Sequence, residues 1–152
     1  MHAVQGDLVA PLDEGNEDLK REDFYNFDVI VISMALHHVE DPQKMISKLV
    51  ERLRDGGSLL VIDWSPSPGG DSHLHHHQHI HQHHQDHDDV QRQMKAVMQT
   101  MIRTSFGEDE MIAMLKDAGC SPVDYVLDPD ISKLPAQFGG ERRLFFAKGK
   151  KS

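Results

Sequence analysis

The hydrophobic positions of the chain fall into short runs that alternate between strand-like and helix-like spacing. Apolar β-formers from Val29 to Ile32 predict a strand at 28–33 that is buried on both faces, as parallel strands are. Apolar residues then recur at spacings of one, three and four over 42–54, which predicts an amphipathic helix. Another apolar run predicts a strand at 58–63. Strand, helix and strand in this order indicate a parallel crossover.

Both ends of the helix predicted at 42–54 are marked by residues that favour helix ends. Asp41 is a good N-cap, because its carboxylate can accept a hydrogen bond from an unpaired amide, and Pro42 suits the first helical position. The pair Gly56-Gly57 is expected to end the helix, since glycine readily takes the left-handed conformation of a C-cap. We therefore expect a helix with sharp ends, packed on the sheet between two buried strands.

The rest of the chain predicts further short elements. A short strand is expected at 3–7, and helices at 90–102 and 108–118. Candidate closing strands lie near 123–127 and 142–147. Strands that alternate with helices in this way predict the α/β fold class.

A histidine-rich tract interrupts this pattern. The prolines and glycines of 65–70 break regular structure, and nine of the fifteen residues at 73–87 are histidine. Neutral imidazoles bind zinc, nickel and copper, but ordered zinc sites need ligands at spacings that fix the geometry. We therefore expect a low-complexity insertion at 65–89. The alternative is a histidine-rich protein that binds metal or senses pH.

Composition narrows the function classes. The 152 residues amount to one domain, and the formal net charge of -9 argues against a nucleic-acid partner. The lone cysteine, Cys120, excludes an internal disulfide and is expected to be a small apolar residue past a helix end. No secretory signal is visible, and no apolar run approaches the ~20 residues that span a bilayer. These features predict a cytoplasmic protein without a membrane partner.

The segment Phe27–Trp64 resembles part of a known family. Its strand, Ala35-Leu-His-His-Val39 turn, capped helix and second strand are similar to the fourth strand, fourth helix and fifth strand of class I S-adenosylmethionine-dependent methyltransferases. The likeness is closest to the small-molecule, ubiquinone-biosynthesis-like group, and it is looser from Ser105 onward. It implies a Rossmann-like fold with a mostly parallel sheet and an antiparallel closing hairpin. It also implies methyl transfer from S-adenosylmethionine to a small-molecule substrate.

The chain departs from the family's pattern at its amino end. The family opens with a strand and a Gly-x-Gly-x-Gly turn that lets the backbone approach the cofactor, whereas this sequence contains no Gly-x-Gly. The acidic residue that would hold the ribose is missing too. If Gly6-Asp7 corresponds to the turn after the family's third strand, the chain begins about two units, roughly 60 residues, late.

Residues 1–152 are therefore expected to form a single, amino-terminally truncated methyltransferase domain. It could be catalytic, or it could be a non-catalytic remnant or interaction module. A sheet that lacks its central strand exposes an unpaired edge, which is a known route to self-association.

The resemblance assigns cofactor contacts to two turns. Asp7 would accept a hydrogen bond from the adenine amino group and Leu8 would pack on the ring, unless Asp7 is an ordinary turn residue. Ser33, Met34 and Ala35 would line the cofactor cleft. These three residues follow the first strand, and ligands of open α/β sheets bind at the carboxyl ends of strands.

Polar residues at the ends of two predicted strands are the candidate catalytic and substrate-side residues. His37 or His38 could take a proton from the acceptor, because an imidazole titrates near neutrality. Alternatively, His37 could only shape the pocket above the helix start. Asp63 and Trp64 would lie on the substrate side, with Trp64 as an apolar wall. Asp63 could instead only hydrogen-bond the turn that follows it.

Overall fold

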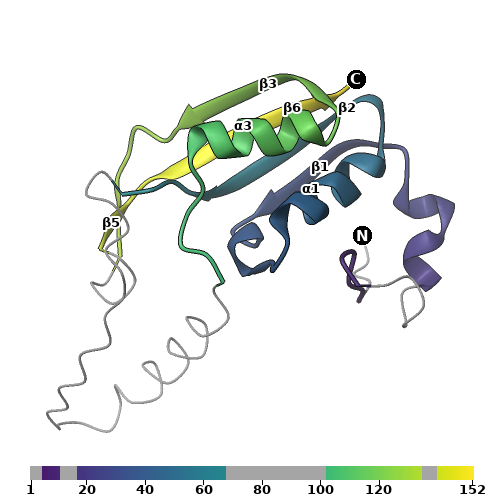
Figure 1. Cartoon of the computed structure of the whole chain (residues 1–152), viewed down its shortest axis with the longest axis horizontal. Coiled ribbons are helices and arrows are strands. Elements are labelled where there is room, and N and C mark those ends of the chain that lie inside the picture. Colours follow the sequence, from purple (N-terminus) through teal and green to yellow (C-terminus); the bar gives the residue numbers. More distant parts are fainter. Residues whose placement is uncertain (1–4, 11–16, 68–101, 135–139) are drawn as a thin grey trace, which may run out of the picture.

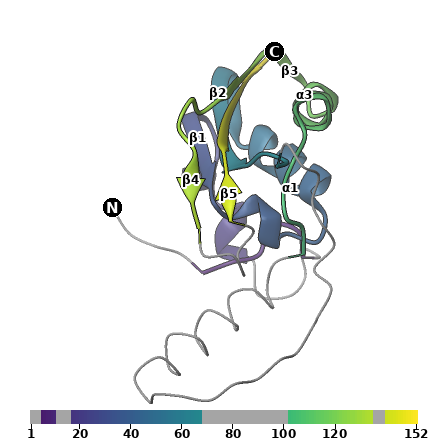
Figure 2. The same cartoon turned by 90° about the vertical axis from the view of Figure 1, so that its left-hand side faces the viewer.

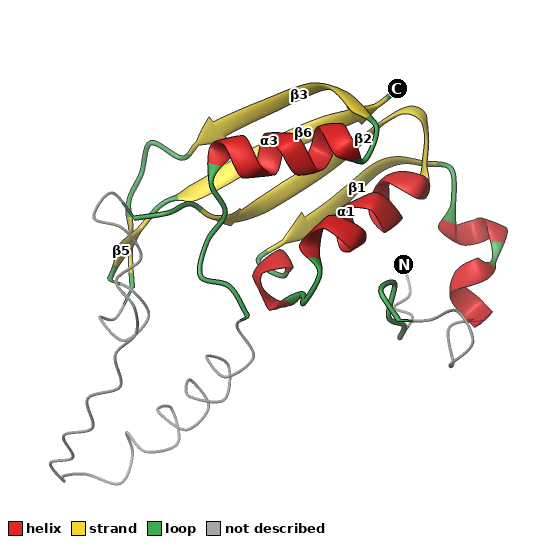
Figure 3. Cartoon of the chain, in the orientation of Figure 1, coloured by secondary structure: helices red, strands yellow, loops and turns green. Residues whose placement is uncertain are grey.

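A computed structural model of the chain describes residues 5–10, 17–67, 102–134 and 140–152. They form a twisted β-sheet with two α-helices on one side (Figure 1). The elements in chain order are η1 (Glu17–Lys20), η2 (Glu22–Phe24), β1 (Phe27–Ser33), η3 (Leu36–His38), α1 (Pro42–Glu51), β2 (Leu53–Trp64), α3 (Glu108–Asp117), β3 (Cys120–Leu127), β4 (Ser132–Lys133), β5 (Glu141–Arg142) and β6 (Leu144–Lys151). Figure 3 shows these helices and strands along the chain. The α/β class expected from the sequence is therefore present.

The main sheet has the strand order β1-β2-β6-β3. β1 and β2 are parallel and are joined through α1, while β6 runs antiparallel to both β2 and β3. Three strands therefore point one way, and their carboxyl ends lie at the same edge of the sheet, on the left in Figure 1. β4 and β5 pair as a separate hairpin near this edge.

The hydrophobic core lies between the sheet and the two helices. α1 and α3 both cover the same face, and the turned view leaves the opposite face without a described helix (Figure 2). Both helices direct apolar residues of 3.6-residue spacing onto alternate positions of the strands. The fully buried side chains of this core include Leu36, Ile46, Leu59, Val61, Phe106, Met111, Leu115, Phe145 and Ala147.

β1 lies where the sequence predicts a strand, but the prediction that it is buried on both faces is wrong. Ile30 and Ile32 pack against the core. Val29 and Val31, on the opposite face, are 58% and 53% exposed. The physical reason is the one-sided helix layer, because an apolar run is buried on both faces only if both faces are covered.

The start of α1 follows the sequence prediction and its end does not. Asp41 is the N-cap, and its Oδ1 accepts the backbone N–H of Lys44 at 2.9 Å. The helix ends at Glu51, with Arg52 as the C-cap residue in a right-handed conformation. The glycine pair that we expected to end this helix lies inside β2, which begins at Leu53.

Gly56 and Gly57 instead form a bulge in β2. Phe27 pairs with Leu53 and Val29 with Ser58, so two steps along β1 correspond to five along β2. Gly56 has a φ of 73°, the left-handed region that favours glycine. The bulge absorbs the additional residues and lets the β1–β2 ladder resume after it.

Replacing Gly57 by alanine should lower the free energy of unfolding by about 2–3 kcal/mol. A Cβ at Gly57 would lie 2.8 Å from the carbonyl oxygen of Phe27 and 2.9 Å from that of Arg54, and backbone atoms cannot move aside cheaply. Urea denaturation of both proteins measures the difference. The matched control is Gly107→Ala, where a Cβ has no neighbour within 4 Å and the change should cost at most about 1 kcal/mol. Equal stability of the two variants would contradict the close approach.

Other predicted elements differ or lie outside the described residues. Residues 5–7 of the strand predicted at 3–7 have no regular structure. The strand predicted at 142–147 is divided between β5 and β6. Arg143 belongs to neither strand, although its carbonyl accepts the N–H of Ser65 at 2.9 Å. The structure does not describe residues 68–101. The histidine tract lies within this range, and so does the helix predicted at 90–102 except for its last residue.

None of the helices in the described ranges has the length and apolar character that crossing a bilayer requires.

Candidate functional site at the carboxyl ends of β1 and β2

A buried imidazole–carboxylate pair joins the ends of the two parallel strands. His37 lies in the η3 turn after β1, and Asp63 lies near the end of β2. The His37 Nδ1 atom is 2.7 Å from Asp63 Oδ1. The His37 backbone N–H donates to Asp63 Oδ2 at 3.2 Å. Both residues are almost completely buried, so the pair fixes the turn to the sheet without competition from water.

Asp63 accepts hydrogen bonds from a third donor as well. The backbone N–H of Trp64 donates to Asp63 Oδ1 at 2.8 Å. The two backbone N–H groups can only donate, so the Asp63 carboxylate is the acceptor of this cluster. We therefore place the hydrogen of the neutral His37 ring on Nδ1, which donates to Asp63. The Nε2 atom of His37 is then left with its lone pair, which is the arrangement that a proton acceptor requires.

The sequence left open whether Asp63 belongs to the site or only hydrogen-bonds the turn that follows it, and in the structure it contacts both. Asp63 bonds its own following residue, as the simpler interpretation expected, and it also holds His37. His38 is half-buried, and its ring centroid lies 4.1 Å from that of His37. Trp64 is partly buried at the end of β2. The structure thus brings the predicted catalytic and substrate-side residues to one place.

The turn directly after β1 is exposed and locally fixed. Ser33, the last residue of β1, is exposed, as are Met34 and Ala35 of the turn. Met34 has a φ of 51°, which is uncommon for a residue with a side chain, and its N–H donates to the carbonyl of Ile62 at 2.9 Å. Residues with such rarely populated backbone angles are concentrated at functional sites, where the surrounding structure holds them in place. The turn can therefore present backbone groups to a ligand at the sheet edge.

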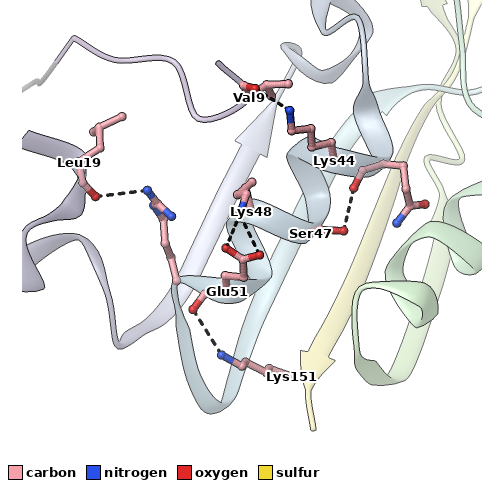
Figure 4. Close-up of polar contacts among 9 residues, drawn as sticks. Val9, Leu19, Lys44, Ser47, Lys48, Glu51 and Lys151 are labelled. Atoms are coloured by element: carbon pink, nitrogen blue, oxygen red, sulfur yellow. Dashed lines mark hydrogen bonds and ion pairs between the residues drawn. The ribbon is translucent and has the colours of Figure 1, made fainter. Parts of the chain in front are cut away.

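Asp7 has a local hydrogen-bonding role in the structure. Its Oδ1 accepts the N–H groups of Val9 at 2.8 Å and Ala10 at 3.2 Å, which closes a turn that includes Leu8. The Lys44 ammonium, on the first turn of α1, donates to the Val9 carbonyl at 2.8 Å (Figure 4). The turn predicted for the cofactor's adenine is thus tied to the helix that follows the β1 turn.

Residues 102–106, which the sequence analysis did not assign to the site, contact its two strand ends. The N–H groups of Ile102 and Arg103 both donate to the His37 carbonyl at 3.1 Å, and the N–H of Phe106 donates to the Trp64 carbonyl at 2.9 Å. The Arg103 guanidinium donates to Glu110 at 2.6 Å and lies 4.6 Å from the centre of the Phe106 ring. No spacing in the sequence could have indicated the contacts with His37 and Trp64, because they join residues more than forty positions apart.

The positively charged Arg142 side chain also contacts this segment. Its Nη1 atom donates to the Thr104 carbonyl at 2.5 Å. Its Nε atom is buried, and among the described residues it has no hydrogen-bond partner. The arginine therefore has an unused donor beside the segment that contacts His37 and Trp64.

Two other ionisable groups have raised pKa values. Burial raises the pKa of the Cys120 thiol, and the nearby Lys151 ammonium offsets only part of this effect. Cys120 is buried and lies just past the end of α3, as the sequence predicted. Burial, with a smaller contribution from the Glu108 carboxylate, raises the pKa of Tyr125 to about 12. Within the described ranges, no cluster of His, Cys, Asp and Glu side chains could hold a metal ion.

Comparison with known proteins gives one family. A family model for a methyltransferase domain matches residues 4–125. The ubiquinone/menaquinone biosynthesis C-methyltransferase of Escherichia coli O139:H28 is 30% identical to this chain over 105 residues, 65% of this chain and 41% of that protein. The protein of the same name from Shigella boydii serotype 18 gives the same values. The chain thus spans about two fifths of the length of these relatives.

Solved structures support the fold. Phosphoethanolamine N-methyltransferase 2 of Haemonchus contortus, in complex with phosphomonomethylethanolamine and S-adenosylhomocysteine, aligns with a TM-score of 0.52 and 11% identity, over 84% of this chain and 34% of that one. An O-methyltransferase family protein of Burkholderia thailandensis aligns with a TM-score of 0.51 and 12% identity, over 98% of this chain and 35% of that one. At these identities the likeness shows a shared Rossmann-like fold.

Proposed function

Because the chain belongs to the methyltransferase-domain family of class I S-adenosylmethionine-dependent enzymes, we propose that it transfers a methyl group from S-adenosylmethionine to a small molecule in the cytoplasm. The observation that carries the proposal is the buried His37–Asp63 pair, at the carboxyl ends of two parallel strands and beside an exposed turn. Ligands of open α/β sheets bind at this edge.

In this proposal His37 is the proton acceptor and Asp63 is its positioning residue. The carboxylate holds the Nδ1–H of His37, so that Nε2 receives the proton that leaves the acceptor molecule during transfer. His38 packs against the His37 ring and supports its orientation. Because Asp63 is fixed by two backbone N–H groups, the imidazole does not have to be ordered at the moment of reaction.

The residues present fit part of the cofactor. S-adenosylmethionine supplies an electrophilic methyl group on a sulfonium. The exposed Ser33–Ala35 turn would contact it through backbone groups, and Asp7 and Leu8 would contact the adenine. The Asp7 carboxylate already accepts two local N–H groups, so it has less capacity for the adenine than a free carboxylate. No Gly-x-Gly turn in this sequence corresponds to the methionine end.

The acceptor side of the proposed site is formed by Trp64 and Arg103, which are both partly exposed. An indole and a guanidinium together suit a flat, partly apolar molecule with an oxygen substituent. The Escherichia coli relative is named for ubiquinone and menaquinone biosynthesis. We therefore propose an aromatic acceptor of the quinol type.

Calorimetric titration of the purified chain with S-adenosylmethionine and S-adenosylhomocysteine tests the proposal. The titration is made in chelator, so that metal bound to the histidine tract adds no heat. We expect binding in the micromolar range. Ala35→Trp, which places a bulky ring in the exposed turn, should weaken this affinity at least tenfold. Ala113→Trp is the matched control, because Ala113 is equally exposed but lies on α3, away from the site.

A folded sample that releases no heat with either nucleoside would contradict the cofactor assignment and favour a non-catalytic interaction module. Binding that is unaffected by Ala35→Trp would place the cofactor elsewhere. When binding is observed, transfer of a labelled methyl group to a quinol that lacks one ring methyl tests the acceptor class. Binding without transfer to any such quinol would exclude that class.

A further inference from the structure

The Arg142 guanidinium has hydrogen-bond donors that the fold does not use. Its Nη1 atom donates to the Thr104 carbonyl at 2.5 Å, whereas its buried Nε atom has no partner among the described residues. In a guanidinium, the Nε–H and one N–H of Nη2 lie along the same edge of the planar group, and Nη1 is not part of that edge. Because a buried donor without an acceptor is unfavourable, this edge lacks a partner in the free protein.

Arg142 also lacks a neighbouring negative charge. Arg103, in the segment that Arg142 contacts, is paired with Glu110 at 2.6 Å. Within the described ranges, neither Arg142 nor the adjacent Arg143 forms an ion pair with a carboxylate. The chain has 25 acidic and 16 basic residues, so unpaired arginines at this edge do not follow from its composition. The local positive charge favours an anion.

The unused donors lie beside the acceptor side of the proposed site. Thr104, which Arg142 contacts, directly follows Arg103, whose N–H donates to the His37 carbonyl at 3.1 Å. Two residues of chain span at most about 7 Å, so the Arg142 guanidinium lies within about 13 Å of the His37 carbonyl. An acceptor molecule next to Trp64 and Arg103 can therefore extend toward it.

The geometry points to a carboxylate on the acceptor molecule as the partner of Arg142. This inference rests on the proposed function, because it takes the acceptor to bind between the His37 imidazole and the Arg142 guanidinium. Two parallel N–H groups match the two oxygens of a planar carboxylate, and charge-assisted pairs of this kind are strong and directional. Arg142 as a whole is half-buried, so its side chain can be approached from the edge of the sheet. The acceptor is then a quinol with a carboxylate on its ring.

S-adenosylmethionine has a carboxylate of its own, but it belongs to a different part of the proposed site. The cofactor contacts are assigned to the turn after β1 and to the turn at Asp7. In the strand order β1-β2-β6-β3, β1 lies on one side of β2 and β6 on the other. Arg142 belongs to β5, directly before β6. It therefore approaches the site from the side opposite to β1.

Titration calorimetry of the full chain with 2,5-dihydroxybenzoate and hydroquinone, under argon and in chelator, tests the inference. The two quinols differ only in a carboxylate, which should raise the affinity about tenfold or more. Arg142→Gln should bind both equally, because glutamine can still donate to the Thr104 carbonyl but has neither the charge nor the guanidinium edge. Arg143→Gln is the matched control, since it removes the same charge from the adjacent residue. It should keep the preference for the carboxylate.

The contrary outcomes are distinct. Equal affinity of the original chain for the two quinols, or no measurable binding of either, overturns the inference. An equal loss of the preference in both glutamine variants would indicate a general attraction by positive charge, and it overturns the inference as well. A weaker affinity of Arg142→Gln for S-adenosylhomocysteine would assign the arginine to the cofactor's carboxylate instead.

Two further measurements keep the result unambiguous. The quinols are titrated with and without S-adenosylhomocysteine, so that absence of nucleoside binding contradicts the proposed function and leaves the carboxylate preference to decide the inference. Far-ultraviolet circular dichroism checks that Arg142→Gln is folded. If it is not, Arg142→Lys takes its place, because lysine keeps the charge but offers no flat edge with two donors. This variant should lose most of the preference, and a preference kept in full overturns the inference.

Discussion

Replacing Asp63 by alanine should lower the free energy of unfolding by about 3–5 kcal/mol, because it leaves buried polar groups unpaired. The Asp63 carboxylate accepts hydrogen bonds from the backbone N–H groups of His37 and Trp64 and from the His37 ring. Alanine offers no acceptor, and both His37 and Asp63 are almost completely buried. Since domains of this size have a total stability of only about 5–15 kcal/mol, a loss of this size would bring the chain close to unfolding at room temperature.

Urea denaturation followed by tryptophan fluorescence measures this loss. The chain has a single tryptophan, Trp64, next to the substituted residue, so the signal reports on the site itself. Asp124→Ala is the control, because Asp124 is an exposed carboxylate on β3. It should change stability by no more than about 0.5 kcal/mol. If the two variants were equally stable, the contacts of Asp63 would not contribute to the fold as described.

Replacing His37 by glutamine should lower the rate of methyl transfer by about 10²–10⁴-fold, the usual contribution of a positioned proton acceptor. Glutamine can still donate to Asp63, so the turn should remain in place, but an amide does not accept a proton near neutral pH. The affinity for S-adenosylmethionine should therefore change little. The dependence of the rate on pH should also change, because the proton acceptor is lost.

His38→Gln is the matched control for the base assignment. His38 is the neighbouring, half-buried imidazole, and its ring centroid lies 4.1 Å from that of His37. We expect its rate to fall less than tenfold and its pH profile to keep the shape of the original. A greater loss in His38→Gln than in His37→Gln would transfer the catalytic role to His38. An unchanged pH profile in both variants would exclude an imidazole base.

The exposure of Val29 and Val31 shows where hydropathy patterning has its limit. The run from Val29 to Ile32 correctly predicts a strand, because β-branched side chains favour extended backbone. It cannot predict how many faces of that strand are covered. That depends on where other segments pack, and the two described helices lie on the same face.

The glycine pair at 56–57 shows the same limit for local signals. Glycine after an amphipathic segment is typical of a helix end, yet α1 ends before it. The deciding factor is that Leu53 is buried in the core and paired with Phe27 of β1. The strand contacts are made over a long sequence separation, and they determine the local conformation of the glycines as a bulge.

The sequence by itself determined the β1–α1–β2 unit, its Asp41-Pro42 helix start and the candidate residues at its strand ends, because these depend on neighbours a few positions apart. Only the tertiary structure decided that His37 and Asp63 form a buried pair and that a segment from 102 to 106 closes over them. These contacts join residues 26 and more than forty positions apart, and hydrogen bonds of that kind follow from packing, which local propensity does not encode.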